Sequence, residues 1–150
     1  MIRVVLTVLV AVALLAASMP ALETARTNTT AERLDAEGER VERAIAGVVS
    51  GSVAVEERAL AARTTTTVRA PRGLTAAQID RLALVNGERV VLRYQIEGGP
   101  ERSVSVVPAT LSAAVAVDDG PIELRPRGES RIEFRFVDDD GPTVKIARVK

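Results

Sequence analysis

The sequence has 150 residues, enough for one domain and a membrane anchor, and its 20 basic and 20 acidic residues give no net charge. This balance argues against nucleic acid as a partner, because a nucleic-acid-binding surface needs a clear basic excess. The chain has no cysteine and no histidine, so disulfides, thiolate metal sites, the commonest metal ligand and the usual general base near neutral pH are absent.

The first element is a run over residues 4–17 that is apolar apart from Thr7 and follows a single basic residue, Arg3. A cleaved secretory signal is one interpretation, since Ala16-Ala17-Ser18 has small residues at the spacing of a cleavage site. Met19-Pro20 follows directly, however, and a proline so close to the cut makes the site imperfect. The other interpretation is an anchor that is kept.

We favour the retained anchor, which takes residues 1–22. As a helix, residues 4–22 would be about 28 Å long, close to the ~30 Å hydrocarbon core of a bilayer. The stretch has no charged side chain before Glu23, and a very short charged head before an apolar run is typical of a signal-anchor. We therefore expect a single-pass protein of the cell membrane that contacts lipid through this helix and carries its C-terminal body outside the cytoplasm.

Residues 23–50 are expected to form a second, amphipathic helix. Thr27-Asn28-Thr29-Thr30 is a weak helical patch, so a break is expected there, with Thr29 and Glu32 capping the restart. The apolar residues beyond it fall at spacings of seven, four and three and form one stripe: Leu34, Val41, Ile45 and Val48. Either this stripe packs on the chain's own β-domain, or it binds a partner helix in an assembly.

A connector over residues 51–63 is expected to lead into an antiparallel β-domain over residues 64–150. Alternating or β-branched runs between turn residues predict about seven strands, and the Asn86-Gly87 pair predicts a type I′ hairpin turn. The expected strands are 64–70, 80–85, 89–97, 103–107, 113–117, 122–124 and the terminal hairpin from residue 132 to 149. The expected fold class is α+β, with a transmembrane helix, an amphipathic helix and a sandwich-like domain or single curled sheet.

Two acidic turns, Asp118-Asp119-Gly120 and Asp138-Asp139-Asp140-Gly141, invite a calcium-binding interpretation. The second lacks the later glutamate of an EF-hand calcium loop, and a solvated hairpin turn explains it better. The first turn has the same explanation. We therefore expect no metal and no cofactor.

Asn28-Thr29-Thr30 matches the N-glycosylation pattern, so Asn28 is a candidate modification site. Catalysis is not expected, because serine and threonine have no histidine base here and the chain has neither a G-x-S-x-G elbow nor a phosphate-binding glycine motif.

The basic residues are strongly biased towards arginine. Lys145 and Lys150 are the only lysines among the 20 basic residues, so 18 are arginines. The composition of a GC-rich genome explains this bias, and a functional arginine surface is the second interpretation.

The first 50 residues resemble the N-terminal helix of type IV pilin-like proteins. The likeness rests on the apolar first half, on Leu15-Ala16-Ala17 leading to Pro20, and on the amphipathic second half with its stripe. In that family the apolar half holds the subunit in the membrane and later packs in the filament core, and a β-rich head follows. The chain departs from the family because no processing glycine precedes the run and residues 4–22 contain no glutamate.

Most of the chain also resembles an uncharacterised group of short haloarchaeal membrane proteins associated with pilus-type secretion genes. The matching pieces are Met1-Ile2-Arg3-Val4, Ser18-Met19-Pro20-Ala21 and the terminal hairpin with its return strand 144–149. The two resemblances imply a membrane-anchored accessory or minor pilin-like subunit, with pilus or secretion subunits as partners. The alternative is an anchored or secreted extracytoplasmic β-domain that binds a ligand or protein.

Overall fold

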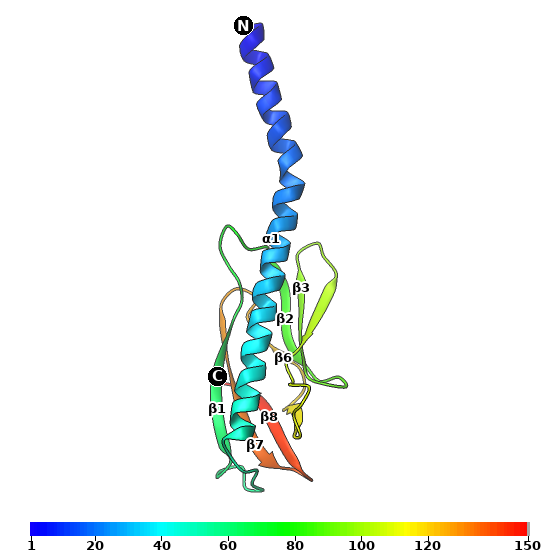
Figure 1. Ribbon diagram of the computed structural model, residues 1–150. Helices are drawn as coiled ribbons and strands as arrows, with labels where there is room; N and C mark the ends of the chain where they lie inside the picture. The colour runs from blue at the N-terminus through cyan, green and yellow to red at the C-terminus, as the bar shows by residue number, and fades with distance from the viewer. Residues whose placement is uncertain (150) are drawn as a thin grey trace.

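The computed structural model describes residues 1–149, in which one long helix precedes two small β-sheets (Figure 1). Lys150, the last residue of the expected β-domain, lies outside the described residues. The elements are α1 (Ile2–Ser50), β1 (Ala62–Arg69), β2 (Ile79–Val85), β3 (Val91–Ile96), β4 (Glu101–Ser105), β5 (Ala114–Val117), β6 (Ile122–Glu123), β7 (Glu129–Asp138) and β8 (Pro142–Arg148). The expected α+β class is confirmed.

Helix α1 is continuous, so the break expected at residues 27–30 and the capped restart at Thr29 are wrong. Threonine and asparagine each cost at most about 0.7 kcal/mol relative to alanine in a helix, an effect that tertiary contacts override. Thr30 is buried, and its Oγ1 accepts a hydrogen bond from the N–H of Ala77 at 2.8 Å. This contact joins residues far apart in the sequence, so no local pattern predicts it. It stabilises the helical conformation of residues 27–30.

The hydroxyl groups near and within the apolar half of α1 are satisfied inside the helix. Thr7, Ser18 and Thr24 donate to the carbonyl oxygens four residues earlier at 2.8, 2.7 and 2.9 Å. Such bonds leave no free hydroxyl donor along an apolar helix. Pro20 lies inside α1 without ending it, although it removes one backbone hydrogen bond.

The two sheets have the strand orders β1-β7-β8-β5 and β4-β3-β2-β6. Neighbouring strands are antiparallel except for β5, which pairs with β8 in parallel. Inward side chains from both sheets, among them Phe134, Leu82 and Leu92, belong to one buried cluster. The sheets therefore pack face to face as a small sandwich, and each alternates buried and exposed residues along its long strands.

The second half of α1 packs against β1, its neighbour β7, and β4, and β1 and β4 are edge strands of the two sheets (Figure 1). The stripe residues are buried in the same cluster as the sheet residues: Leu34, Val41, Ile45 and Val48. Burying a side chain of this kind contributes about 1.5–3 kcal/mol. The stripe therefore holds α1 on the chain's own sheets and is not free to bind a partner helix.

Gly38 allows α1 to approach β4 closely. A Cβ at this position would lie 3.0 Å from Cγ1 of Val104 and 3.9 Å from Cγ1 of Val106. Gly47, in the same half of the helix, is exposed, and a Cβ there would have no heavy atom within 4 Å. The low helix propensity of glycine is therefore offset by packing at Gly38 but not at Gly47.

Glu37 links α1 to the edge of β1. Its Oε2 accepts a hydrogen bond from the Arg69 N–H at 3.0 Å, and its Oε1 lies 2.8 Å from Nη1 of Arg40. An edge strand has N–H groups that no neighbouring strand pairs, and Glu37 satisfies one of them. Together with the bond between Thr30 and Ala77, this contact determines the position of α1 along the sandwich.

The type I′ turn expected at Asn86-Gly87 is wrong. Val85 pairs with Val91 across a longer loop, and neither Asn86 nor Gly87 has the positive φ that this turn requires. The side chain of Asn86 instead accepts a hydrogen bond from the Val117 N–H at 2.8 Å and donates one to the Val117 carbonyl at 3.2 Å. This asparagine therefore joins the loop after β2 to β5, a strand of the other sheet.

The two helix glycines should respond to the same substitution in different ways. Gly47→Ala should raise the free energy of unfolding by up to about 1 kcal/mol, because alanine is the better helix former. In Gly38→Ala the added Cβ would press against Val104, and this close contact should cancel the gain in helix propensity. Gly38→Leu should lower the free energy of unfolding by about 1–3 kcal/mol through overpacking. Urea titration of the full chain in detergent micelles measures all three, and equal gains for both alanine variants would contradict the close approach.

Tyr94 is the chain's only tyrosine and is buried on the inner side of β3. Burial raises its pKa above the ordinary value of 10.0, and the Asp35 carboxylate on α1 raises the pKa further, while Arg102 lowers it. The folded state thus favours the neutral phenol. The stabilisation that comes from burying the neutral phenol of Tyr94 is complete at pH values below its pKa in the unfolded chain. This stabilisation is lost as the pH rises through its pKa in the folded chain.

We predict that the tyrosinate absorbance of the folded chain has its midpoint above pH 10 and that unfolding in urea returns the midpoint to about 10. Asp35→Asn should lower the native midpoint, since it removes a negative charge near the phenol. Asp140→Asn, in the distant β7–β8 turn, is the control and should leave it unchanged. A native midpoint at or below that of the unfolded chain would show that the phenol is not buried as described.

Candidate functional site

The first half of α1 extends away from the body (Figure 1), and from Val4 to Leu22 its exposed side chains are apolar apart from Thr7 and Ser18. None of its apolar window is buried, and the large exposed hydrophobic residues there are Met1, Ile2, Val4, Val5, Leu6, Val8, Leu9, Val10, Val12, Leu14, Leu15, Met19 and Leu22. Water-exposed proteins rarely carry apolar patches above a few hundred Å². By length and composition this helix can cross a membrane, so lipid or other apolar helices are the surroundings it fits.

Asn28, the candidate glycosylation site, is exposed on α1 between the apolar half and the body. The threonine that completes its pattern, Thr30, is buried and bonded to Ala77. Acceptor asparagines usually lie in surface loops, whereas this one lies inside a helix. Modification of Asn28 stays a prediction, and it would have to precede the docking of α1 on the sheets.

The acidic turn between β7 and β8 uses its carboxylates locally. Asp138 accepts a hydrogen bond from the Gly141 N–H at 2.9 Å, and Asp139 lies 2.6 Å from Nζ of Lys145. The hydrogen bond from Lys145 lowers the pKa of the Asp139 carboxyl. Within residues 1–149, no three His, Cys, Asp or Glu side chains are grouped so that they could hold a metal ion.

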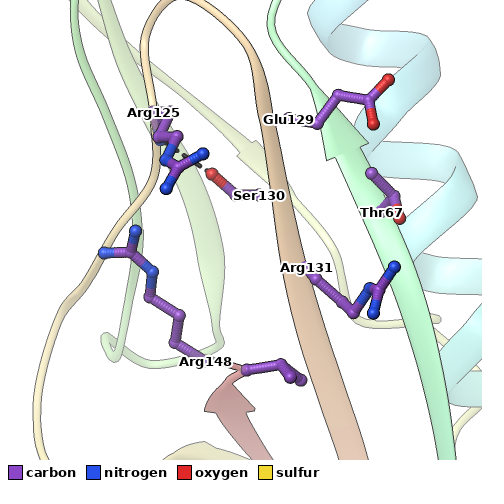
Figure 2. A pocket seen from close by; sticks show the side chains of 7 residues that line it. Thr67, Arg125, Glu129, Ser130, Arg131 and Arg148 are labelled. Carbon is purple, nitrogen blue, oxygen red and sulfur yellow. Dashed lines mark hydrogen bonds between the residues drawn. The ribbon is translucent and has the colours of Figure 1, made fainter.

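A recess of about 240 Å³ lies at one end of the first sheet, beside the loop between β6 and β7 (Figure 2). It takes side chains from β1, β7, β8 and this loop, and three of them are arginines. The lining residues are Thr67, Arg125, Glu129, Ser130, Arg131, Arg148 and Val149.

Strand pairing and the loop bring these arginines to the rim of the recess from three parts of the chain, with Arg131 on the β1 side of β7 and Arg125 and Arg148 on its other side (Figure 2). Arg131 lies near the start of β7, and Arg148 lies at the end of β8, the strand that pairs with it. The backbone N–H of Arg125 donates to the buried Ser130 Oγ at 2.8 Å, which holds the loop against β7. Arg148 is itself positioned because its Nη1 donates to the carbonyl of Glu123 at 3.2 Å.

The recess carries a positive charge. Its one carboxylate, Glu129, is paired with Arg69, with 3.0 Å between Oε1 and Nε. In the described part of the chain no carboxylate forms an ion pair with Arg125, Arg131 or Arg148. Planar guanidinium groups match the oxygens of phosphate and carboxylate groups, so the chemistry of this recess suits an anionic group.

Sequence reasoning missed this recess. The arginine bias was visible, but Arg125, Arg131 and Arg148 share no local spacing that marks a site. One signal was available in the predicted terminal hairpin, because counting outward from its turn places Arg131 close to Arg148. The contribution of Arg125 depends on the loop contact to Ser130, which no local pattern indicates.

The chain belongs to the family described as Domain of unknown function (DUF7311), whose model matches residues 1–149. The chain matches no curated protein and no solved structure.

Pyrophosphate should bind the full chain in neutral detergent micelles through the arginine-lined recess. Arg125→Gln and Arg131→Gln should each weaken the affinity about tenfold, because each removes a charge-assisted hydrogen bond. Arg89→Gln, at an exposed position in the loop after β2, is the matched control and should have no effect. Isothermal titration calorimetry measures the affinities, and equal values for all variants would show that the recess does not bind the anion.

Proposed function

We propose that this chain is a non-enzymatic, single-pass membrane protein that serves as an accessory or minor pilin-like subunit of a pilus or secretion apparatus, with its β-domain outside the cytoplasm. The observation that carries the proposal is the division of α1 into two halves. The first half is apolar and exposed throughout, and the second half is built into the core of the body. The pilin-like proteins that the N-terminal helix resembles use such a helix to join membrane and head.

The exposed half of α1 also has a side that suits helix packing. Ala13, Ala17, Ala21 and Ala25 recur at every fourth position, so they lie along one side of the helix. Small residues on one side allow helices to approach closely where no hydrophobic effect drives them together. Because the apolar stripe of the second half is buried in the chain's own core, this alanine side and the outer faces of the sheets are the surfaces proposed for partners.

The proposal predicts contacts from the alanine side of α1 to apolar helices of other subunits. A diazirine-bearing residue at Ala17, activated by light in native membranes, should give protein adducts with other helices. The same residue at Leu15 is the matched control, because it lies about 200° around the helix and should give fewer protein adducts than Ala17. Mass spectrometry identifies the adducts.

Two results would contradict the proposal. Lipid adducts alone from both positions would leave α1 as an anchor without helix partners. An intact mass that lacks residues 1–18 in the membrane-extracted protein would mean that the anchor is removed, which favours a secreted β-domain.

The arginine-lined recess favours a second candidate function, an anchored extracytoplasmic module that captures an anionic group of a ligand or protein. The recess is formed by the sheet and not by α1, so the helix would serve only as an anchor. Lipid adducts alone from α1, together with pyrophosphate binding that depends on Arg125 and Arg131, would favour this candidate over the pilin-like one.

A further inference from the structure

A loop of the body rises beside α1 towards its apolar half. This loop, residues 70–78, joins β1 to β2 and extends past the ends of the strands (Figure 1). It is tied to the helix where the Ala77 N–H donates to Thr30 Oγ1 at 2.8 Å. Thr30 follows Leu22, the last residue of the apolar half, by eight positions, or about 12 Å along the helix.

Leu74, in this loop, is 88% exposed although the loop is held in place. The Ala76 N–H donates to the Gly73 carbonyl at 3.1 Å, and Gly73 has the positive φ, 103°, that the turn requires. Leu74 lies three positions before Ala77, a span of at most about 10 Å. Since the headgroup layer extends roughly 5–8 Å beyond the hydrocarbon core, Leu74 can reach it when α1 crosses the bilayer.

A second recess, of about 370 Å³, lies between this loop and the corner before β7. Among the described residues, its lining includes two arginines, Arg72 and Arg127, and no carboxylate. Guanidinium groups bind phosphate oxygens strongly, and basic residues close to a bilayer are attracted to anionic lipids. The membrane-facing end of the body thus combines an exposed leucine with two arginines.

The far end of the body has more acidic than basic residues. The connector after α1 carries Glu56, Glu57 and Arg58, and the β7–β8 turn carries Asp138, Asp139 and Asp140, of which Asp139 pairs with Lys145. The β3–β4 turn, which rises to the same end as the 70–78 loop (Figure 1), carries Glu97 and Glu101. The attraction of this end to an anionic bilayer therefore rests on Arg72 and Arg127 and not on a charge difference between the two ends of the body.

We propose that the 70–78 loop and Arg127 form a second membrane contact, in which Leu74 enters the headgroup layer and Arg72 and Arg127 bind the phosphates of anionic phospholipids. This contact rests on the proposed anchoring of α1 in the same bilayer. It holds the body upright against the membrane, so the outer faces of the sheets keep one orientation towards partners.

Single labelled cysteines test the contact, because the natural chain has none. An environment-sensitive fluorophore is attached at Leu74→Cys, at Leu60→Cys and at Val10→Cys in the full chain, reconstituted in vesicles that contain phosphatidylglycerol. Leu60 is the matched control, a leucine that is 73% exposed in the connector at the far end. We expect iodide to quench the label at position 74 about fivefold less than the label at position 60. Arg72→Gln combined with Arg127→Gln, or vesicles of phosphatidylcholine alone, should reduce this protection.

The label at position 10 separates this inference from the proposed anchoring. If position 10 is protected from iodide while positions 74 and 60 are quenched equally, the membrane contact of the loop is overturned and the anchor stands. If position 10 is itself quenched, the anchoring proposal fails and the contact fails with it. If millimolar inorganic phosphate abolishes the protection of the label at position 74 from iodide, the arginines bind a free anion. This result would overturn the lipid contact.

Discussion

The rest of the structure depends on the packing of the second half of α1 against the open side of the sandwich. The chain has only three aromatic residues and no disulfide, so most of its core is built from aliphatic side chains that must find apolar neighbours. Leu34, Val41 and Ile45 supply part of that apolar volume, and they do so beside two edge strands that no other strand covers. Helix and sheets therefore complete one core together, and the exposed apolar half continues the same helix beyond that core.

Polar contacts refine this packing. Gly38 determines how closely α1 approaches β4, while Glu37 and Thr30 bond to backbone groups of β1 and of the loop after it. The apolar stripe alone would tolerate some sliding along the helix axis, whereas these directional bonds do not. The position of the 70–78 loop relative to the apolar half follows from them. The proposed membrane contact of this loop thus depends on the same contacts.

Much of the fold could be predicted because it rests on local periodicity. Buried residues recur at every second position along β7. The apolar residues Leu34, Val41 and Ile45 recur at spacings of seven and four, which correspond to two turns and one turn of a helix. Both periods are visible in the sequence without any tertiary information. The features that escaped prediction depend on partners far along the chain. The continuity of α1 depends on Ala77, the role of Asn86 depends on Val117, and the arginine-lined recess depends on loop and strand pairing.

The unbroken helix has a geometric consequence for the whole molecule. Each residue of an α-helix advances the chain by about 1.5 Å and turns it by about 100°. One residue inserted between Leu22 and Thr30 would swing the entire β-domain by about 100° around the helix axis relative to the apolar half, whereas seven residues would nearly restore its facing and move it about 10 Å further away. The length of this short segment therefore sets the azimuth of the body, and with it the flank of the sandwich that neighbouring molecules would meet.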